Sequence, residues 1–113
     1  MAAQRIDATS RKTFLDGFTG QHHGWLVRVE TIARDGDREV VIDDLPLERI
    51  TTNDGAIDIV ADERTHHIEA AMDVIVERAY GDAVSSLRFI APSGETILTF
   101  RTVIAPELVD GMV

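Results

Sequence analysis

Apolar and polar residues alternate with a period of two through most of this chain, and four short turn motifs interrupt the alternation. The motifs are Asp35-Gly36, Asp54-Gly55, Gly81-Asp82 and Ser93-Gly94. A period of two is typical of β-strands that bury one face, and Asp-Gly is a preferred two-residue hairpin loop. The pattern from Trp25 onward therefore predicts an antiparallel β meander.

Each turn also predicts a strand register in which apolar residues share one face. At the first turn the predicted pairs are Val29–Ile42 and Thr31–Val40, with an ion pair between Arg28 and Asp43 on the opposite face. At the second turn they are Ile50–Ile59 and Thr52–Ile57, and across a tighter reversal at Asp62-Glu63 they are Ile57–Ile68 and Ile59–His66. At the third turn they are Val76–Leu87 and Val74–Phe89, and at the last they are Leu87–Phe100 and Phe89–Leu98. A slip by one residue would send a whole apolar set to the wrong face. Agreement between successive turns is therefore stronger evidence than any one of them.

One short helix is predicted before the sheet, over residues about 9–20. Thr9 or Ser10 can cap its first turn, and Gly20 is a plausible stop. Its apolar stripe consists of Phe14, Leu15 and Phe18. Such a stripe is large enough to dock on a sheet but too small to stabilise a helix alone.

Two segments depart from the alternation. In residues 43–49, Pro46 lacks the N–H that a central strand needs, so this segment is predicted to be a corner where the chain crosses between parts of the sheet. Residues 69–73 are compatible with a bulge, a bend or a turn of helix.

Together these elements predict one α+β domain, mostly β, over residues 1–113, with a helix at about 9–20, a sheet at about 25–103 and a tail at 104–113. The helix is expected to pack on a strongly curved antiparallel meander or small barrel of about six to eight short strands, because closure removes exposed edges. A chain of 12.5 kDa buries about two-thirds of its surface on folding. That is enough for a core without disulfides.

Composition excludes several classes of function. Acidic residues outnumber basic ones by 20 to 11, for a formal net charge of −9, which disfavours binding to nucleic acids and to anionic membranes. The chain has no cysteine, so disulfides and thiolate metal sites are excluded and a cytoplasmic location fits. No signal-like or membrane-spanning apolar run is present.

Histidine supplies the first candidates for chemistry, in the pairs His22-His23 and His66-His67. Neighbours on a strand point to opposite faces, so His66 and His67 cannot both ligate one ion. A metal site would need a histidine from each pair and a carboxylate such as Asp62 or Glu63. The more ordinary interpretation places His66 at the core edge, bonded to a neighbour, and His22 and His23 solvated in a loop. His66 is a pocket candidate because the register puts this polar ring on the apolar side.

Trp25, Ile90 and Ile97 are the other candidates. Tryptophan is enriched at binding hot spots, but the favoured interpretation is that Trp25 caps the core beside Phe14 and Phe18, because so large a ring is seldom left exposed in a small domain. Ile90 and Ile97 are predicted to pair directly on the face opposite the main core, as part of a second buried face or a subunit contact. No nucleophile elbow, phosphate-binding loop or metal motif is present, so the sequence assigns no catalytic, metal-binding or cofactor-binding residue and no cofactor.

The order of these features resembles a family of small bacterial proteins of unknown function, about 110 residues long. The resemblance is carried by the helix before HHGWLVRVE, the DLPLERI corner, the THHI strand and the closing LRFIAPSGETILTFR hairpin, and it spans about Phe14 to Met112. It implies no activity and no site residues. A helix followed by a curved sheet is also similar to Sm-like and other SH3-like small barrels, in fold alone.

The leading functional expectation is a non-enzymatic interaction module that assembles as a homo-oligomer, with no nucleic-acid or membrane partner and an unknown small-molecule ligand. The alternative is a small-ligand or metal-dependent enzyme that uses His66 with His22 or His23 and a nearby carboxylate. RNA binding, by analogy with Sm-like barrels, would need basic grooves with aromatic stacking positions. This chain is strongly acidic and has a single tyrosine, Tyr80, so RNA binding is not expected.

Overall fold

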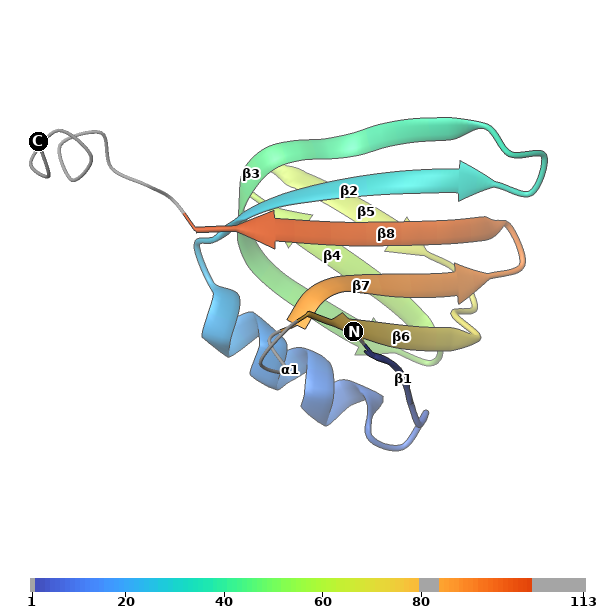
Figure 1. Ribbon diagram of the computed structural model, residues 1–113, viewed down its shortest axis with the longest axis horizontal. Coiled ribbons are helices and arrows are strands. Elements are labelled where there is room, and N and C mark those ends of the chain that lie inside the picture. Colours follow the sequence, from blue (N-terminus) through green and yellow to red (C-terminus); the bar gives the residue numbers. More distant parts are fainter. Residues whose placement is uncertain (1, 80–83, 103–113) are drawn as a thin grey trace, which may run out of the picture.

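The computed structural model describes residues 2–79 and 84–102. Its elements are β1 (Ala2–Ile6), α1 (Arg11–His22), β2 (Leu26–Ala33), β3 (Arg38–Asn53), β4 (Ala56–Ala61), β5 (Arg64–Ile68), β6 (Asp73–Arg78), β7 (Val84–Ala91) and β8 (Gly94–Arg101). The strands form one antiparallel sheet in the spatial order β1-β6-β7-β8-β2-β3-β4-β5 (Figure 1). The prediction of a mostly β fold with one helix is confirmed. A closed barrel is not: within the described ranges, β1 and β5 are the two open edges.

The sheet folds over on itself because β3 is long and bulged. Residues 38–46 pair with β2 and residues 47–53 pair with β4. Bulges interrupt the ladder beside Val29 and again between Leu47 and Arg49, and each bulge bends and twists its strand. As a result β4 and β5 lie behind β7 and β8 (Figure 1), and the buried side chains of both layers form one cluster. The predicted corner at residues 43–49 is thus the place where the chain passes from one layer to the other, although it is bulged strand and not a break.

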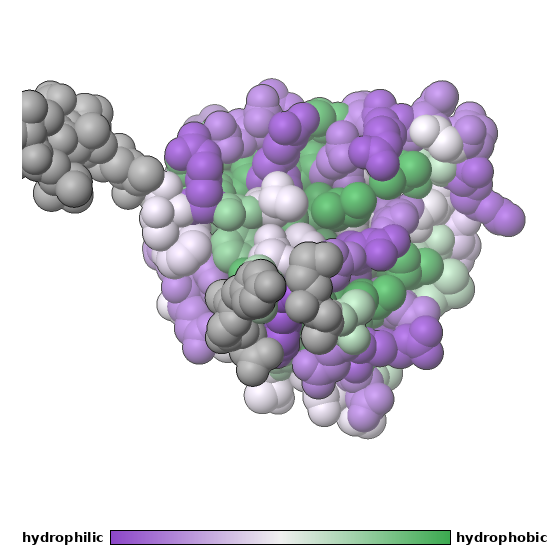
Figure 2. Space-filling model, viewed as in Figure 1, coloured by the Kyte–Doolittle hydropathy of each residue, from purple (hydrophilic) through white to green (hydrophobic). Residues whose placement is uncertain are grey.

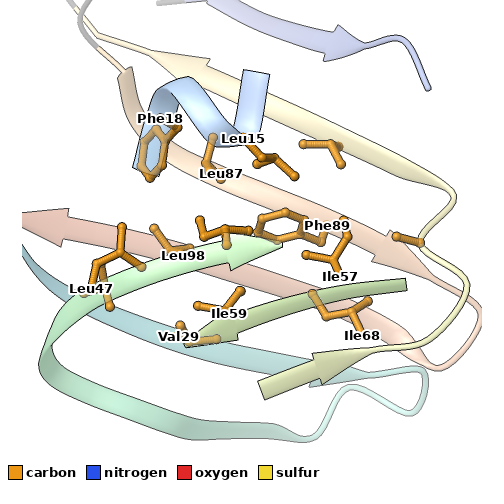
Figure 3. Close-up of a cluster of buried hydrophobic side chains, with 14 of the residues drawn as sticks. Leu15, Phe18, Val29, Leu47, Ile57, Ile59, Ile68, Leu87, Phe89 and Leu98 are labelled. Carbon is orange, nitrogen blue, oxygen red and sulfur yellow. The ribbon is translucent and has the colours of Figure 1, made fainter. Parts of the chain in front are cut away.

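The core fills the space between the layers. Its largest fully buried members are Phe89, Leu15, Leu47, Ile50, Ile57, Ile59, Leu87, Leu98, Val27, Val29, Val74 and Val76. Figure 3 shows Phe89 among side chains from both layers, with Leu15 and Phe18 of α1 above them. Burying each such side chain stabilises the fold by about 1.5–3 kcal/mol, so the alternating pattern of the sequence accounts for the architecture.

Helix α1 packs against β3. Ser10 occupies the N-cap position without a side-chain cap bond, and Thr19 Oγ1 accepts a hydrogen bond from the Ile50 amide at 3.1 Å. The helix runs two residues past the predicted stop at Gly20. It continues because His22 packs on the preceding turn, where its Nδ1 lies 2.9 Å from the Phe18 carbonyl oxygen.

Most of the predicted registers are confirmed. The observed pairs include Val29–Ile42, Ile50–Ile59, Thr52–Ile57, Ile57–Ile68, Ile59–His66, Val76–Leu87 and Val74–Phe89. The third predicted turn, at Gly81-Asp82, and the predicted tail at 104–113 lie outside the described residues.

The first hairpin departs from its predicted register beyond Val29. Thr31 lies opposite Glu39, and Val40 lies opposite Glu30, so the prediction of a Thr31–Val40 pair is wrong. The extra residues of the β3 bulges cause the shift. The bulge places both Asp43 and Asp44 opposite Arg28. The predicted ion pair between Arg28 and Asp43 is not among the ion pairs of the described residues, where Asp44 pairs with Arg101 at 3.1 Å.

The last hairpin is shifted by two residues from the prediction. Leu87 pairs with Leu98, not Phe100, and Phe89 pairs with Thr96, not Leu98. Ala91 pairs with Gly94, so Pro92-Ser93 forms the loop in place of Ser93-Gly94. A shift of two residues keeps every side chain on its predicted face.

Strand β1 was not expected from the sequence. It pairs with β6 over its whole length, from Ala2–Arg78 to Ile6–Val74. Its sequence, AAQRI, is short and rich in alanine, a residue with little β propensity. In the ambiguous segment 69–73, residues 69–70 form a turn, residues 71–72 link it to β6, and Asp73 begins β6. The Ala71 amide donates to the Gly55 carbonyl oxygen at 2.7 Å. No helix in the part of the chain that the structure describes is long and apolar enough to cross a membrane.

Candidate functional site

His66 lies on the inner side of β5, opposite Ile59 of β4. Its ring is half-buried, and Nε2 is 3.4 Å from Oγ1 of Thr96 in β8, a residue only 5% exposed. This contact links the two layers of the fold. Burial lowers the pKa of His66, and the neighbouring His67 lowers it further, against a smaller opposing effect of Asp58. The ring is therefore neutral at pH 7, with one donor and one acceptor nitrogen.

His67 lies on the opposite, solvent-facing side of β5. Its Nδ1 is 2.6 Å from Oδ1 of Asp58, and its Nε2 is 3.0 Å from Oε1 of Glu69. The hydrogen bond to Asp58 is the main cause that raises the pKa of His67, followed by the bond to Glu69. Adjacent histidines thus have pKa values displaced in opposite directions.

The pH dependence of stability is expected to differ in sign between variants of these two residues. The pKa of His66 is lower in the folded protein than in the unfolded chain, so as pH falls the unfolded chain binds this proton before the folded protein does. The contribution of His66 to the free energy of unfolding therefore decreases as pH drops below about 6.5. For His67, the contribution is present below about 6.5 and is lost as pH rises through the raised pKa. His67→Gln should therefore make stability rise more steeply from pH 5 to 8, and His66→Gln should make it rise less or fall. Urea unfolding at four pH values measures both slopes, and identical slopes would contradict the assignment.

A cavity of about 230 Å³ adjoins His66. It is lined by His66, His67 and Ile68 of β5, by Ile32 and Ala33 of β2, and by Thr96 of β8, among others. His66 therefore lies at the core edge in contact with Thr96 and also lines a cavity, so the two interpretations of this residue are compatible.

Trp25 lies at the other end of the molecule, in a cluster of aromatic rings. The His22 ring stacks on Phe18 with ring centroids 4.1 Å apart, and its edge contacts Trp25 at 4.6 Å and Phe100 at 4.7 Å. Trp25 itself is half-buried. This arrangement favours the interpretation of Trp25 as a cap on the core. The expectation of a solvated His22 in a loop is wrong, because His22 is the last residue of α1 and packs within this cluster.

The two histidine pairs do not converge on one site. His22 contacts Phe100 and His66 contacts Thr96, and these partners are four residues apart on β8, a distance of about 13 Å. Metal ligands lie about 2.0–2.3 Å from their ion. Nowhere in residues 2–79 and 84–102 do three histidine, aspartate or glutamate side chains group in a way that could hold a metal ion. The constellation expected for the metal-dependent enzyme is thus not assembled.

Ile90 and Ile97 lie on the face of the sheet opposite the core, both half-buried. The prediction that they pair directly is wrong. Ile90 lies opposite Glu95, and Ile97 lies opposite Arg88. The two-residue shift of the last hairpin causes the difference. Ile32 of β2 and Ile75 of β6 are half-buried on the same face.

Sequence reasoning missed one buried residue of interest, Arg11 at the start of α1. Its guanidinium donates hydrogen bonds to the carbonyl oxygens of Ala71 at 3.1 Å and Met72 at 3.2 Å, while its Nε is buried without a partner. It therefore ties the helix to the link between β5 and β6. A lone arginine at a helix start gives no sequence signal for this role, whereas the inward position of Thr96 follows from its alternation with Leu98.

Comparison with known proteins gives one match. Residues 2–107 match the sequence profile described as Family of unknown function (DUF5335). No curated protein and no solved structure matches the chain. The helix, the bulged corner, the histidine-bearing strand and the closing hairpin all fall within the matched residues, and the chain belongs to this family of unknown function, DUF5335.

Proposed function

We propose that this protein is a non-enzymatic interaction module that self-associates through the outer face of its larger layer. The outer face is defined here as the outward side of β1, β6, β7, β8, β2 and the first half of β3. Its apolar centre consists of Ile32, Ile75, Ile90 and Ile97, all half-buried. In Figure 1 no described element lies in front of β2, β7 and β8. Figure 2 shows hydrophobic patches between hydrophilic ones on this side.

The observation that carries the proposal is the charge balance of this face. It holds five arginines against six carboxylates: Arg5, Arg28, Arg38, Arg88, Arg101, Glu30, Asp43, Asp44, Asp73, Glu77 and Glu95. The chain as a whole has a net charge of −9, so nearly all of the excess negative charge lies elsewhere. Two copies would repel each other over most of their surface and least over the outer face.

Most of these charges are already paired within the chain. Arg88 bridges Glu95 and Glu77, Arg5 lies 3.2 Å from Asp73, and Arg38 lies 3.1 Å from Glu30. Association therefore need not leave these charges without partners, which would cost several kcal/mol each. The ion pairs alternate with the isoleucines and supply a polar surround for them, as at other interfaces.

The size of the face fits a dimer contact. Six strands spaced by about 4.8 Å and eight residues rising about 3.3 Å each give a flat area of roughly 600 Å². A standard interface takes about 800 Å² of accessible surface from each partner, which is of the same order. The proposal therefore commits to a second copy of this chain as the occupant.

Light scattering coupled to size exclusion tests the proposal. At 100 μM the wild type is expected to have about twice the monomer mass of 12.5 kDa, and Ile97→Lys is expected to return it to the monomer because it places a charge in the apolar centre. Met72→Lys is the matched control, since Met72 is 55% exposed and lies off this face. A monomeric wild type, or equal loss of mass in both variants, would refute the proposal.

A further inference from the structure

The cavity beside His66 runs along the free edge of β5. Three consecutive residues, His66, His67 and Ile68, line it. Successive side chains on a strand point to opposite faces, so a cavity that touches all three contacts the strand along its edge. On its far side the cavity is bounded by Ile32 and Ala33 at the end of β2.

The edge of β5 is regular and open. It is the last strand in the sheet order, and its pairing with β4 is continuous from Ala61–Arg64 to Ile57–Ile68. Its sequence, RTHHI, contains neither proline nor lysine. Natural edge strands are usually protected by such residues or by bulges. The N–H and C=O groups of every second residue along β5 are therefore available to another strand.

We propose that the edge of β5 and its cavity form a strand-addition site for an extended, positively charged peptide segment of a partner protein. Strand addition uses main-chain hydrogen bonds for affinity and a neighbouring pocket for one or two side chains. The volume supports this class of ligand: about 230 Å³ is below the roughly 300–1,000 Å³ of clefts that hold drug-sized molecules. Apolar Ile32 and Ile68 and the hydroxyl group of Thr96 suit a valine or threonine side chain.

The charges around β5 indicate the sign of the ligand. Exposed carboxylates of Asp62, Glu63 and Glu69 lie at the two ends of the strand, against one arginine, Arg64, within it. Asp62 and Glu63 have no ion-pair partner in the part of the chain that the structure describes. Lysine or arginine residues flanking the added strand would pair with these carboxylates. The site shares Ile32 and Glu95 with the margin of the outer face, whereas its strand edge, β5, belongs to the other layer. Peptide binding along β5 can therefore be measured apart from self-association.

A fluorescent peptide tests the proposal. The probe is a seven-residue peptide of alternating threonine and valine with lysine at each end, and binding is followed by fluorescence anisotropy at low salt. Two control peptides have the same side chains but are N-methylated at every second amide. One carries the methyl groups on the odd-numbered amides and the other on the even-numbered amides, so each lacks the N–H donors along one edge of the extended peptide. We expect saturable binding of the probe and at least tenfold weaker binding of one N-methylated form. No binding up to 1 mM, or equal binding of all three peptides, would overturn the proposal.

Protein variants locate the site. Ala33 is exposed and lines the cavity, so Ala33→Leu narrows the cavity and is expected to weaken binding of the probe at least tenfold. Ala3→Leu, on the other edge strand β1, is expected to leave the affinity for the probe unchanged. A probe with glutamate in place of lysine is expected to bind at least threefold more weakly at low salt. Equal effects of the two variants, or equal binding of the two probes, would contradict the assignment. Concentration-dependent protection of β5 amides without probe binding would identify a second copy as the occupant and also overturn it.

Discussion

Replacing Phe89 with alanine is expected to lower the free energy of unfolding by about 3–5 kcal/mol. Phe89 is fully buried on β7, between Val74 of β6 and Thr96 of β8, and it contacts the centre of the core (Figure 3). Its removal loses the transfer free energy of a phenyl ring and leaves a cavity that the two layers can close only in part. A small domain is stable by only about 5–15 kcal/mol, so this single change removes a large share of the stability.

Urea unfolding followed by the fluorescence of Trp25, the only tryptophan, measures this loss. Ile75→Ala is the matched control, because Ile75 lies half-buried on the outer face next to Val74 and Val76. We expect the control to lose no more than about a third as much, because its side chain loses less contact area and leaves no enclosed cavity. Equal losses for the two variants would show that the interior is not between the layers as described.

Replacing Gly94 with alanine is expected to destabilise the fold by about 3 kcal/mol or more. Gly94 has a φ of 143°, a backbone conformation that residues with a Cβ rarely adopt. A Cβ at this position would overlap the carbonyl oxygen of Ile32 and lie 3.1 Å from the Cα of Ala33. Both obstacles are main-chain atoms of β2, so relief requires the β7–β8 hairpin to move away from β2.

Gly17→Ala provides a control of opposite sign. Gly17 lies within α1, and a Cβ there would meet nothing within 4 Å, so alanine should stabilise the helix by up to about 1 kcal/mol. Thermal unfolding of the two variants beside the wild type gives both signs in one experiment. A neutral Gly94→Ala variant would contradict the close approach of the hairpin to β2.

The alternation of apolar residues predicted most of this fold because each strand buries one face. Val29, Ile59 and Phe89 carry that pattern, and each lies in the core as expected. Two kinds of feature escaped it. The bulges of β3 add residues without changing the composition of the strand, so the pairing of Thr31 could not be placed. The last loop was predicted at the wrong residues because a shift of two residues leaves every side chain on the same face of the sheet. Gly94 is compatible both with the predicted loop at Ser93-Gly94 and with the observed loop at Pro92-Ser93.

The candidate residues were predictable to different degrees. The position of His66 opposite Ile59 follows from the turn at Asp62-Glu63 and is confirmed. The distance of His22 from His66 could not be foreseen, because it depends on where the helix ends relative to β8. The buried Arg11 was also out of reach, since its partners are main-chain carbonyl oxygens about 60 residues away, which leave no mark in the sequence.

Dilution of protein with isotope-labelled isoleucine methyl groups, followed by NMR, tests the central claim most directly because it changes no residue. Self-association through the outer face predicts that the methyl signals of Ile32, Ile75, Ile90 and Ile97 shift between 1 mM and 10 μM, while those of the buried Ile50, Ile57 and Ile59 stay fixed. If the outer-face signals are independent of concentration while the protein stays monomeric, the assembly role assigned to this face is wrong.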